Sequence, residues 1–316
     1  MISRRLVLSL PLAAALASAI GGPARAQDAA PAQKLPVVAS FSILGDFVKE
    51  VGGARIALTT IVGPNGDAHV YQPTPADAKA MAAAKVVFVN GLGFEGWLDR
   101  LVKASGTKAT IVVATTGITP RTGFEDHDDA PAGKKDKHGH GDIDPHAWQS
   151  IANAKVYVAN VRDGLIAADP AGRDTYTANA AAYLARLDTL EGEVKSALAR
   201  IPEAQRRIIT SHDAFGYFGE AYGLVLIAPE GVSTESEASA KDVARIIRQI
   251  KAQKIPAVFV ENITDPRLTQ RIARESGAKV GGELYSDALS DDKGPASTYI
   301  DMMRSNVREL SSALAS

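Results

Sequence analysis

Short runs rich in β-branched residues alternate with stretches of helical periodicity along most of this chain, and that alternation constrains the fold more than any other feature. It favours a mainly parallel sheet with helices on both faces. We predict strands at residues 37–39, 57–62, 86–89, 110–113, 207–210, 225–227, 257–260 and 279–280. Helices are predicted at residues 43–51, 75–84, 95–104, 215–222, 240–253, 266–276 and 297–315.

A long helical region divides this alternation into two blocks. Residues 148–168 have helical character, Asp169 and Pro170 interrupt it, and residues 171–200 form an uninterrupted run with apolar residues three or four positions apart. About 30 residues at 1.5 Å each would reach ~45 Å, comparable with a whole domain. The run therefore suits a helix that bridges two similar halves.

The fold class that follows is α/β, with two lobes that each hold a mainly parallel sheet flanked by helices, joined by one long backbone helix. We expect an N-terminal lobe at residues 27–170, the linking helix at 171–200 and a C-terminal lobe at 201–316. Two such halves would leave a cleft between them. Folds of this class bind ligands in clefts beside the carboxyl ends of strands.

The first 26 residues have the features of an export signal. Arg4 and Arg5 precede an apolar stretch at residues 6–20, and a small-residue ending predicts cleavage after Ala26. The apolar stretch is shorter than the ~20 residues that a membrane-spanning helix needs, so we expect a cleaved signal and not an anchor. The paired arginines also fit a twin-arginine signal, although the general secretory route is favoured.

Charge and cysteine content limit the partners of the exported chain. Removing the signal changes 35 basic and 36 acidic residues to 32 and 36, a formal charge of −4. A slightly acidic protein has no electrostatic reason to bind nucleic acid or anionic lipid. The chain has no cysteine, so we expect neither disulfides nor a lipid anchor. The expected product is a soluble periplasmic monomer, stabilised by packing and by bound ligand.

Three histidines and one aspartate stand where the chain passes between predicted elements: His69, His146, His212 and Asp287. Three imidazole nitrogens and one carboxylate oxygen can close a tetrahedron around zinc. The intervals of 77, 66 and 75 residues are too long for a zinc finger, so only the fold could bring the four together. Taken singly, each is more commonly a surface residue or a helix cap.

A segment at residues 115–144 interrupts the alternation, with many Gly, Asp, Lys and His residues and few large apolar ones. We interpret it as a mobile loop. His127, His138 and His140 in this segment are candidate auxiliary metal ligands. The alternative is an inert, solvated loop.

Several segments carry a family resemblance, namely residues 63–75 (GPNGDAHVYQPTP), 90–98 (NGLGFEGWL), 144–148 (DPHAW), 211–218 (SHDAFGYF), 261–262 (EN) and 285–289 (YSDAL). They resemble the metal-binding receptors of ABC importers known as cluster A-I, particularly the zinc-specific members of the ZnuA and AztC type. The resemblance implies that His69, His146, His212 and Asp287 are the metal ligands. It also implies delivery of the metal to a membrane permease, and a periplasmic metallochaperone, which loads AztC-type relatives, is a candidate second partner.

Within that family a third histidine suggests Zn²⁺, whereas manganese-binding members use more carboxylate, as the harder ion prefers. We therefore expect a high-affinity zinc receptor and keep a manganese receptor as an alternative. Asp67 and Glu261 could accept the second ring N–H of a ligating histidine, or could simply cap helices. The segment around Asp287 or the loop around His69 is expected to move when the metal leaves.

A zinc hydrolase is the main rival interpretation. His69, His146 and His212 could hold a catalytic zinc, with Asp287 or Glu261 as the general base. The chain contains no His-Glu-x-x-His motif and no Gly-x-Ser-x-Gly elbow. The adjacent residues 211–213 (Ser-His-Asp) do not form a triad, because triads are assembled across a fold. We therefore expect a receptor that is not an enzyme.

Overall fold

The computed structural model describes residues 34–122 and 143–314, which belong to one compact unit, Gln33–Ser316. The predicted signal at residues 1–26 lies outside the described residues, as do His127, His138 and His140. No helix in the described ranges is both long and apolar enough to cross a membrane.

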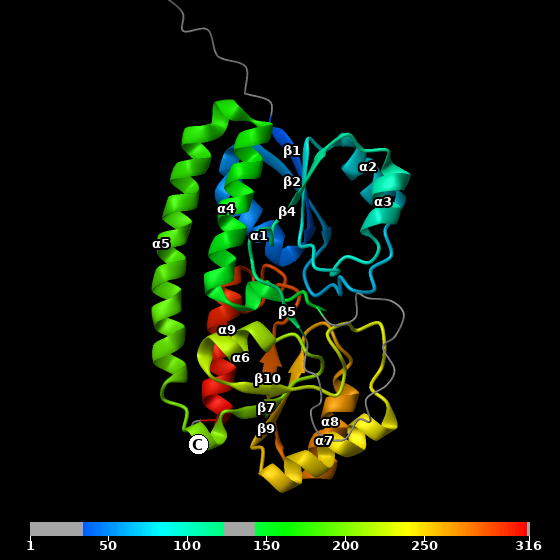
Figure 1. Ribbon diagram of the computed structural model, residues 1–316, viewed down its shortest axis with the longest axis vertical. Helices are drawn as coiled ribbons and strands as arrows, with labels where there is room; N and C mark the ends of the chain where they lie inside the picture. Colours follow the sequence, from blue (N-terminus) through cyan, green and yellow to red (C-terminus); the bar gives the residue numbers. More distant parts are fainter. Residues whose placement is uncertain (1–33, 123–142, 315–316) are drawn as a thin grey trace, which may run out of the picture. The chain divides into compact units, whose positions relative to one another are not determined.

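The first sheet has four parallel strands in the order β2-β1-β3-β4. Its faces are covered by α1 (Ser42–Gly52) and α4 (Ile151–Ala168) on one side and by α2 (Pro75–Ala83) and α3 (Leu98–Ser105) on the other (Figure 1). All of β3 is buried, as expected for a central strand covered on both faces. The strands are β1 (Leu35–Phe41), β2 (Ile56–Val62), β3 (Val86–Val89) and β4 (Thr110–Val113).

The second sheet has four parallel strands in the order β10-β9-β7-β8. Alternate residues of β9 enter different cores. Phe259 joins the large core shared with the first sheet, while Val258 joins a smaller core against α7 and α8. The elements are β7 (Arg207–Ile209), α6 (Gly216–Tyr222), β8 (Val225–Ile227), α7 (Ala240–Gln253), β9 (Ala257–Glu261), α8 (Pro266–Ser276) and β10 (Lys279–Leu284).

Both sheets have the same topology when their strands are counted in chain order. In each, the first strand lies between the second and the third, so the winding direction reverses between β1 and β3 and again between β7 and β9. Loops that leave the carboxyl ends of strands at such a switch point separate and make room for ligands. The two switch points are therefore where functional side chains are expected.

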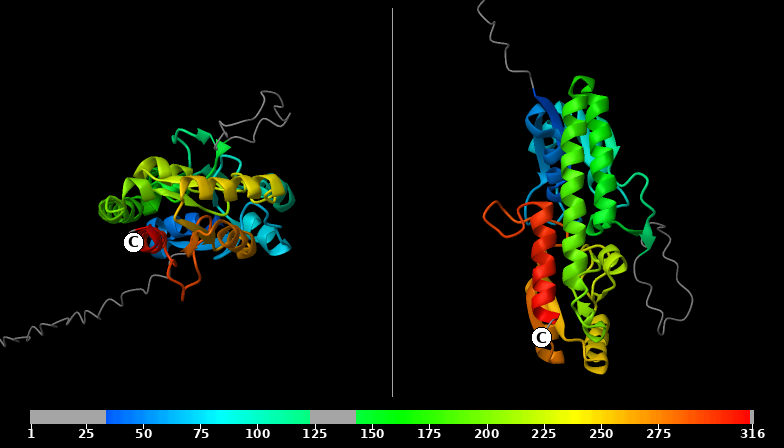
Figure 2. Two further views of the ribbon diagram at one scale, coloured as in Figure 1. Left: turned by 90° about the horizontal axis from the view of Figure 1, so that it is seen from below. Right: turned by 90° about the vertical axis from the view of Figure 1, so that its left-hand side faces the viewer.

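Two long helices join the regions of the two sheets. The helix α5 (Arg173–Leu198) packs on α1 and α4 beside the first sheet and on α9 (Tyr299–Leu314), which contacts β10 of the second sheet (Figure 2). Buried Tyr183, Leu187, Leu190 and Val194 form the apolar stripe of α5, at spacings of three and four residues. The predicted fold class, two parallel-sheet α/β lobes joined by a long helix, is confirmed.

The sequence prediction was wrong at the start of both long helices. Ala147–Gln149 is a 3-10 turn, Ser150 is extended, and α4 begins only at Ile151. Likewise Pro170–Gly172 is a 3-10 turn before α5. In both places a local turn replaces the helical conformation that the periodicity favoured. The limits that we expected for the lobes, residues 27–170 and 201–316, stay predictions.

The segment at residues 115–144 is paired at its described ends. The strand β5 (Arg121–Thr122) pairs antiparallel with β6 (Ile143–Asp144). This ribbon leads directly into His146, and the remainder of the segment, residues 123–142, lies outside the described residues.

Candidate metal centre

His69, His146, His212 and Asp287 meet in one cluster, with one nitrogen or oxygen atom of each lying within 4.8 Å of the others. His69 Nε2 lies 3.3 Å from His146 Nε2 and 3.1 Å from Asp287 Oδ2. His212 Nε2 lies 3.2 Å from the same Asp287 oxygen. The exposed fraction is 5% for His69 and 0% for the other three residues. The fold therefore unites all four residues that the sequence singled out.

His69 is presented by the loop that follows β2. The Trp97 indole Nε1 donates to the Ala68 carbonyl at 2.7 Å, just before the histidine. The His69 backbone N–H donates to Asp67 Oδ1 at 2.9 Å, and Asp67 Oδ2 accepts from Thr234 Oγ1 at 2.6 Å. Asp67 thus bonds the backbone N–H of His69 and not its imidazole, which was one of the two positions that the sequence left open for it.

His146 follows β6 and is oriented by Asp144, which sequence reasoning missed. Asp144 Oδ1 accepts the His146 backbone N–H at 2.9 Å and lies 2.8 Å from its Nδ1, which leaves Nε2 to face the cluster. The other Asp144 oxygen accepts from Arg121 Nη1 at 3.0 Å. A Cβ at Gly216 would lie 1.8 Å from the same Arg121 nitrogen, so only glycine leaves room for this guanidinium. The Asp-x-His spacing, which Asp144 shares with Asp67, could have made Asp144 a candidate but could not show its contact with the ring.

His212 follows β7 at the switch point of the second sheet, where Glu261 ends the neighbouring strand β9. Glu261 Oε2 lies 2.6 Å from His212 Nδ1. Its Oε1 accepts the backbone N–H groups of Ser211 at 2.7 Å and His212 at 3.0 Å. Glu261 therefore lies behind the His212 imidazole, which is one of the two positions that the sequence left open for it.

Asp287 lies in the loop after β10. The carbonyl of the preceding residue, Ser286, accepts from Trp148 Nε1 at 2.9 Å and from Gln149 Nε2 at 2.7 Å. Both donors stand on the 3-10 turn that follows His146. The segments that carry His146 and Asp287, 141 positions apart in the chain, are thus hydrogen-bonded to each other.

The carboxylates and imidazoles change each other's protonation. Burial alone lowers the pKa of His146, but Asp287 and Asp144 outweigh it and raise the pKa to about 9. Burial opposes a charge on His212 too, yet Glu261 and Asp287 raise its pKa well above the usual value. Burial would raise the pKa of Asp287, but His146 and His212 hold it well below its usual range. For His69, burial dominates and lowers the pKa.

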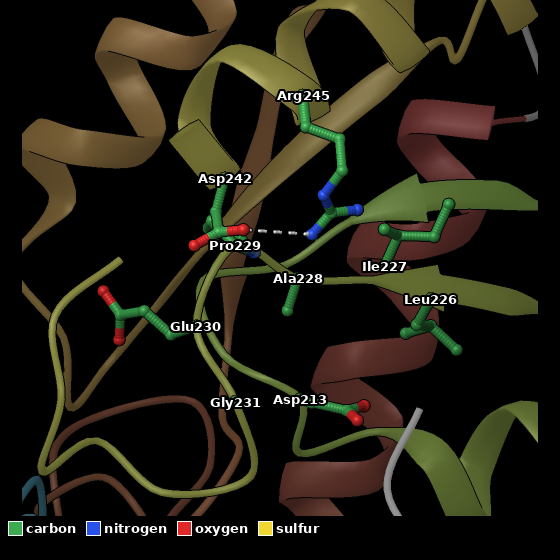
Figure 3. A pocket seen from close by; sticks show the side chains of 9 residues that line it. All are labelled: Asp213, Leu226, Ile227, Ala228, Pro229, Glu230, Gly231, Asp242 and Arg245. Atoms are coloured by element: carbon green, nitrogen blue, oxygen red, sulfur yellow. Dashed lines mark ion pairs between the residues drawn. The ribbon is translucent and has the colours of Figure 1, made fainter. Parts of the chain in front are cut away.

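A separate cavity of about 260 Å³ lies beside the residue that follows His212 (Figure 3). Asp213, Glu230 and Asp242 contribute carboxylates to its lining, and Arg245 Nη2 lies 3.8 Å from Asp242 Oδ1. Burial raises the pKa of the half-buried Glu230. His69, His146, His212 and Asp287 do not line this cavity, so it is distinct from the cluster.

Residues 37–313 match the family described as ZnuA, zinc-uptake complex component A, periplasmic. The chain belongs to this family. Manganese-binding lipoprotein MntA of Halalkalibacterium halodurans is 37% identical over 281 residues, which cover 89% of each chain. Iron-binding protein YfeA of Yersinia pestis is 34% identical over 276 residues, covering 87% of this chain and 85% of the relative. Periplasmic zinc-binding protein TroA from Treponema pallidum superposes with a TM-score of 0.80 at 28% identity, covering 90% of this chain and 100% of TroA.

Membership makes the chain a metal-binding receptor of an ABC importer. The family consists of solute-binding receptors for metal transport and not of enzymes, so the hydrolase alternative is wrong. Receptors of this kind work with a membrane permease. The relatives are named for three different metals, and the family alone therefore leaves the choice of metal open.

Proposed function

We propose that this chain is a high-affinity periplasmic receptor that binds Zn²⁺ through His69, His146, His212 and Asp287 and delivers it to an ABC permease. The observation that carries the proposal is the convergence of three buried imidazoles and one buried carboxylate within 4.8 Å. A tetrahedron with bonds of about 2.0–2.1 Å has edges of ~3.3 Å. Three separations agree with such edges: Asp287 Oδ2 lies 3.1 Å from His69 Nε2 and 3.2 Å from His212 Nε2, and the Nε2 atoms of His69 and His146 are 3.3 Å apart.

The type and number of donors favour zinc over manganese. Three nitrogens and one carboxylate suit a borderline ion with four ligands, whereas manganese prefers oxygen ligands and octahedral coordination. The almost complete burial of the four residues leaves little access for the water molecules that a six-coordinate ion would retain. The manganese receptor is the competing outcome, since one relative at 37% identity is named for that metal.

The charges around the cluster also suit a divalent cation. With neutral imidazoles, Asp287, Asp144 and Glu261 contribute −3 and Arg121 contributes +1, a formal sum of −2. A bound Zn²⁺ would bring this buried group to neutrality, which reduces the cost of burying its charges. Loading by a periplasmic metallochaperone and action as a monomer belong to the same proposal.

The test is the metal content of protein exported by cells and purified without added chelator. We expect one tightly held zinc per chain in the wild type and none in His146→Ala. A variant with His127, His138 and His140 all changed to alanine should keep that one zinc and lose only weakly held ions. Wild-type protein without tight zinc, even after zinc supplementation, would contradict the proposal, and retained manganese would support the competing receptor.

A further inference from the structure

The backbone around Asp287 is fixed by side chains from several other elements. Residues 285–289 have no regular secondary structure, yet side chains from other elements bond five of their ten backbone N–H and carbonyl groups. Asn306 bonds both the N–H and the carbonyl of Tyr285, Asn262 donates to the Ala288 carbonyl, and Ser42 Oγ accepts the Leu289 N–H, at 2.8–3.2 Å. This density of contacts disfavours the Asp287 segment as the part that moves on release.

The most direct of these contacts acts on the residue next to the ligand. The Ser286 carbonyl accepts two hydrogen bonds, from Trp148 and Gln149, which stand two and three positions after His146. A carbonyl with both lone pairs bonded to a rigid turn has little freedom to rotate. The side chain of Asp287 is therefore placed relative to His146 by the same turn that carries His146.

The turn itself is immobilised. The exposed fractions of Trp148 and Gln149 are both 0%. The indole of Trp148 packs against both Phe41 and Phe94, with ring centroids 4.9 Å away in each case. Tyr299 donates its hydroxyl to the Trp148 carbonyl at 2.7 Å. Aromatic packing and a hydrogen bond thus hold the two donors in one orientation.

Only the amide nitrogen of Gln149, and not its amide oxygen, takes part in a hydrogen bond. Its Nε2 bonds Ser286, while its Oε1 is buried and finds no hydrogen-bond partner among the described residues. An unpaired buried acceptor destabilises a protein, and a methionine or leucine of similar size would avoid it. The side chain therefore fits a position that needs an N–H donor more than it needs apolar packing.

We propose that Trp148 and Gln149 are positioning residues that set the metal specificity of the site by fixing the Asp287 carboxylate against the three imidazoles through the Ser286 carbonyl. Selectivity among divalent ions depends on cavity size, ligand number and ligand flexibility. A fixed carboxylate favours an ion with four short bonds. A mobile one can move outward or offer both oxygens, as a larger ion with more oxygen ligands requires. This inference rests on the proposed zinc function.

Gln149→Met removes the amide donor and keeps the side-chain length, and Trp148→Phe removes the indole N–H. Zn²⁺ and Mn²⁺ affinities of full-length variants are measured by competition with a chromophoric chelator. We expect each change to lower zinc affinity by about 10-fold, in the range for groups that orient metal ligands, and the double variant by more. Manganese affinity should change much less. The visible spectrum of the Co²⁺ form should lose intensity as the coordination number rises above four.

Trp97→Phe is the matched control, because Trp97 makes the same kind of bond to the carbonyl before His69. It should lower the affinities for Zn²⁺ and Mn²⁺ by the same factor. The visible spectrum of its Co²⁺ form should remain that of a four-coordinate ion. An unchanged zinc-to-manganese ratio in Gln149→Met overturns the inference, as does an equal change of that ratio in Trp97→Phe. If Trp148→Phe fails to fold, Gln149→Met decides alone. A wild type without preference for zinc contradicts the proposed function itself.

Discussion

His146 and His212 differ from His69 in what stands behind the imidazole. Asp144 lies 2.8 Å from the Nδ1 of His146, and Glu261 lies 2.6 Å from the Nδ1 of His212. At His69, the neighbouring carboxylate of Asp67 bonds the backbone N–H instead. The pKa values follow this division, since the pKa is raised for His146 and His212 and lowered for His69. In the metal-free protein His69 is thus ready to bind metal, whereas the other two must first lose a proton.

The largest effect should come from removing a ligand. Zinc binding energies of about 10–16 kcal/mol correspond to roughly 3–4 kcal/mol for each of four ligands, or about 100- to 1000-fold in affinity. His212→Ala and His146→Ala should reduce zinc affinity by about 1000-fold or more, because each also leaves a buried carboxylate without its imidazole partner. His69→Ala should reduce zinc affinity by about 100-fold, the lower end of this range. Chelator competition measures all three, and equal losses would remove the distinction between the two classes of histidine.

Lowering the pH should weaken zinc binding steeply. In the metal-free protein the pKa of His146 is about 9 and that of His212 is also raised, so zinc must displace about two protons at pH 7. Two displaced protons lower the apparent affinity by about 100-fold per pH unit within this range. The same raised pKa values stabilise the metal-free fold fully below pH ~6.5, and this contribution is lost as the pH rises through about 9.

Calorimetry in buffers with different ionisation enthalpies would count the released protons. Release near two at pH 7 should fall in Asp144→Asn, because one of the two carboxylates that raise the pKa of His146 is gone. Binding without proton release at pH 7, or an affinity unchanged at about pH 5, would contradict the assignment of these imidazoles as ligands.

Removing the carboxylate behind an imidazole should have the next largest effect. Groups that orient metal-bound histidines typically contribute about 10- to 100-fold to affinity. Glu261→Gln should approach 100-fold, since Glu261 also accepts two backbone N–H groups beside His212. Asp144→Asn should be nearer 10-fold, because an amide oxygen can still accept from His146. Zinc dissociation rates would show both effects, and a larger loss in Asp144→Asn would reverse the expected order.

The smallest effect is expected for Asp67→Asn. The amide oxygen can still accept the His69 backbone N–H, and the change touches no imidazole. Zinc affinity should therefore fall by less than about threefold, within the range of one weak hydrogen bond. A loss of 10-fold or more would show that Asp67 acts on the His69 ring in the zinc-bound protein, and the contrast with His146 and His212 would disappear.

The strands and most helices could be predicted, because short runs of β-branched residues mark buried parallel strands and apolar residues recur every three or four positions in helices. The helices at residues 240–253 and 266–276 agree with α7 and α8 at both ends. The turn at Ala147–Gln149 could not be predicted in the same way. Its conformation depends on the Ser286 carbonyl and the Tyr299 hydroxyl, which lie more than 130 positions away.

The amino-acid sequence by itself determined the alternation of strands and helices, the four candidate ligands and the family, since these depend on local periodicity and on short motifs. Only the tertiary structure decided that Asp144 stands behind His146, that Asp67 bonds a backbone N–H and not a ring, and that the turn after His146 is hydrogen-bonded to Ser286. The physical reason is that each of these relations is a contact of about 3 Å whose direction depends on backbone conformation. Asp144 and Asp67 both stand two positions before a histidine, and spacing in the chain cannot tell them apart.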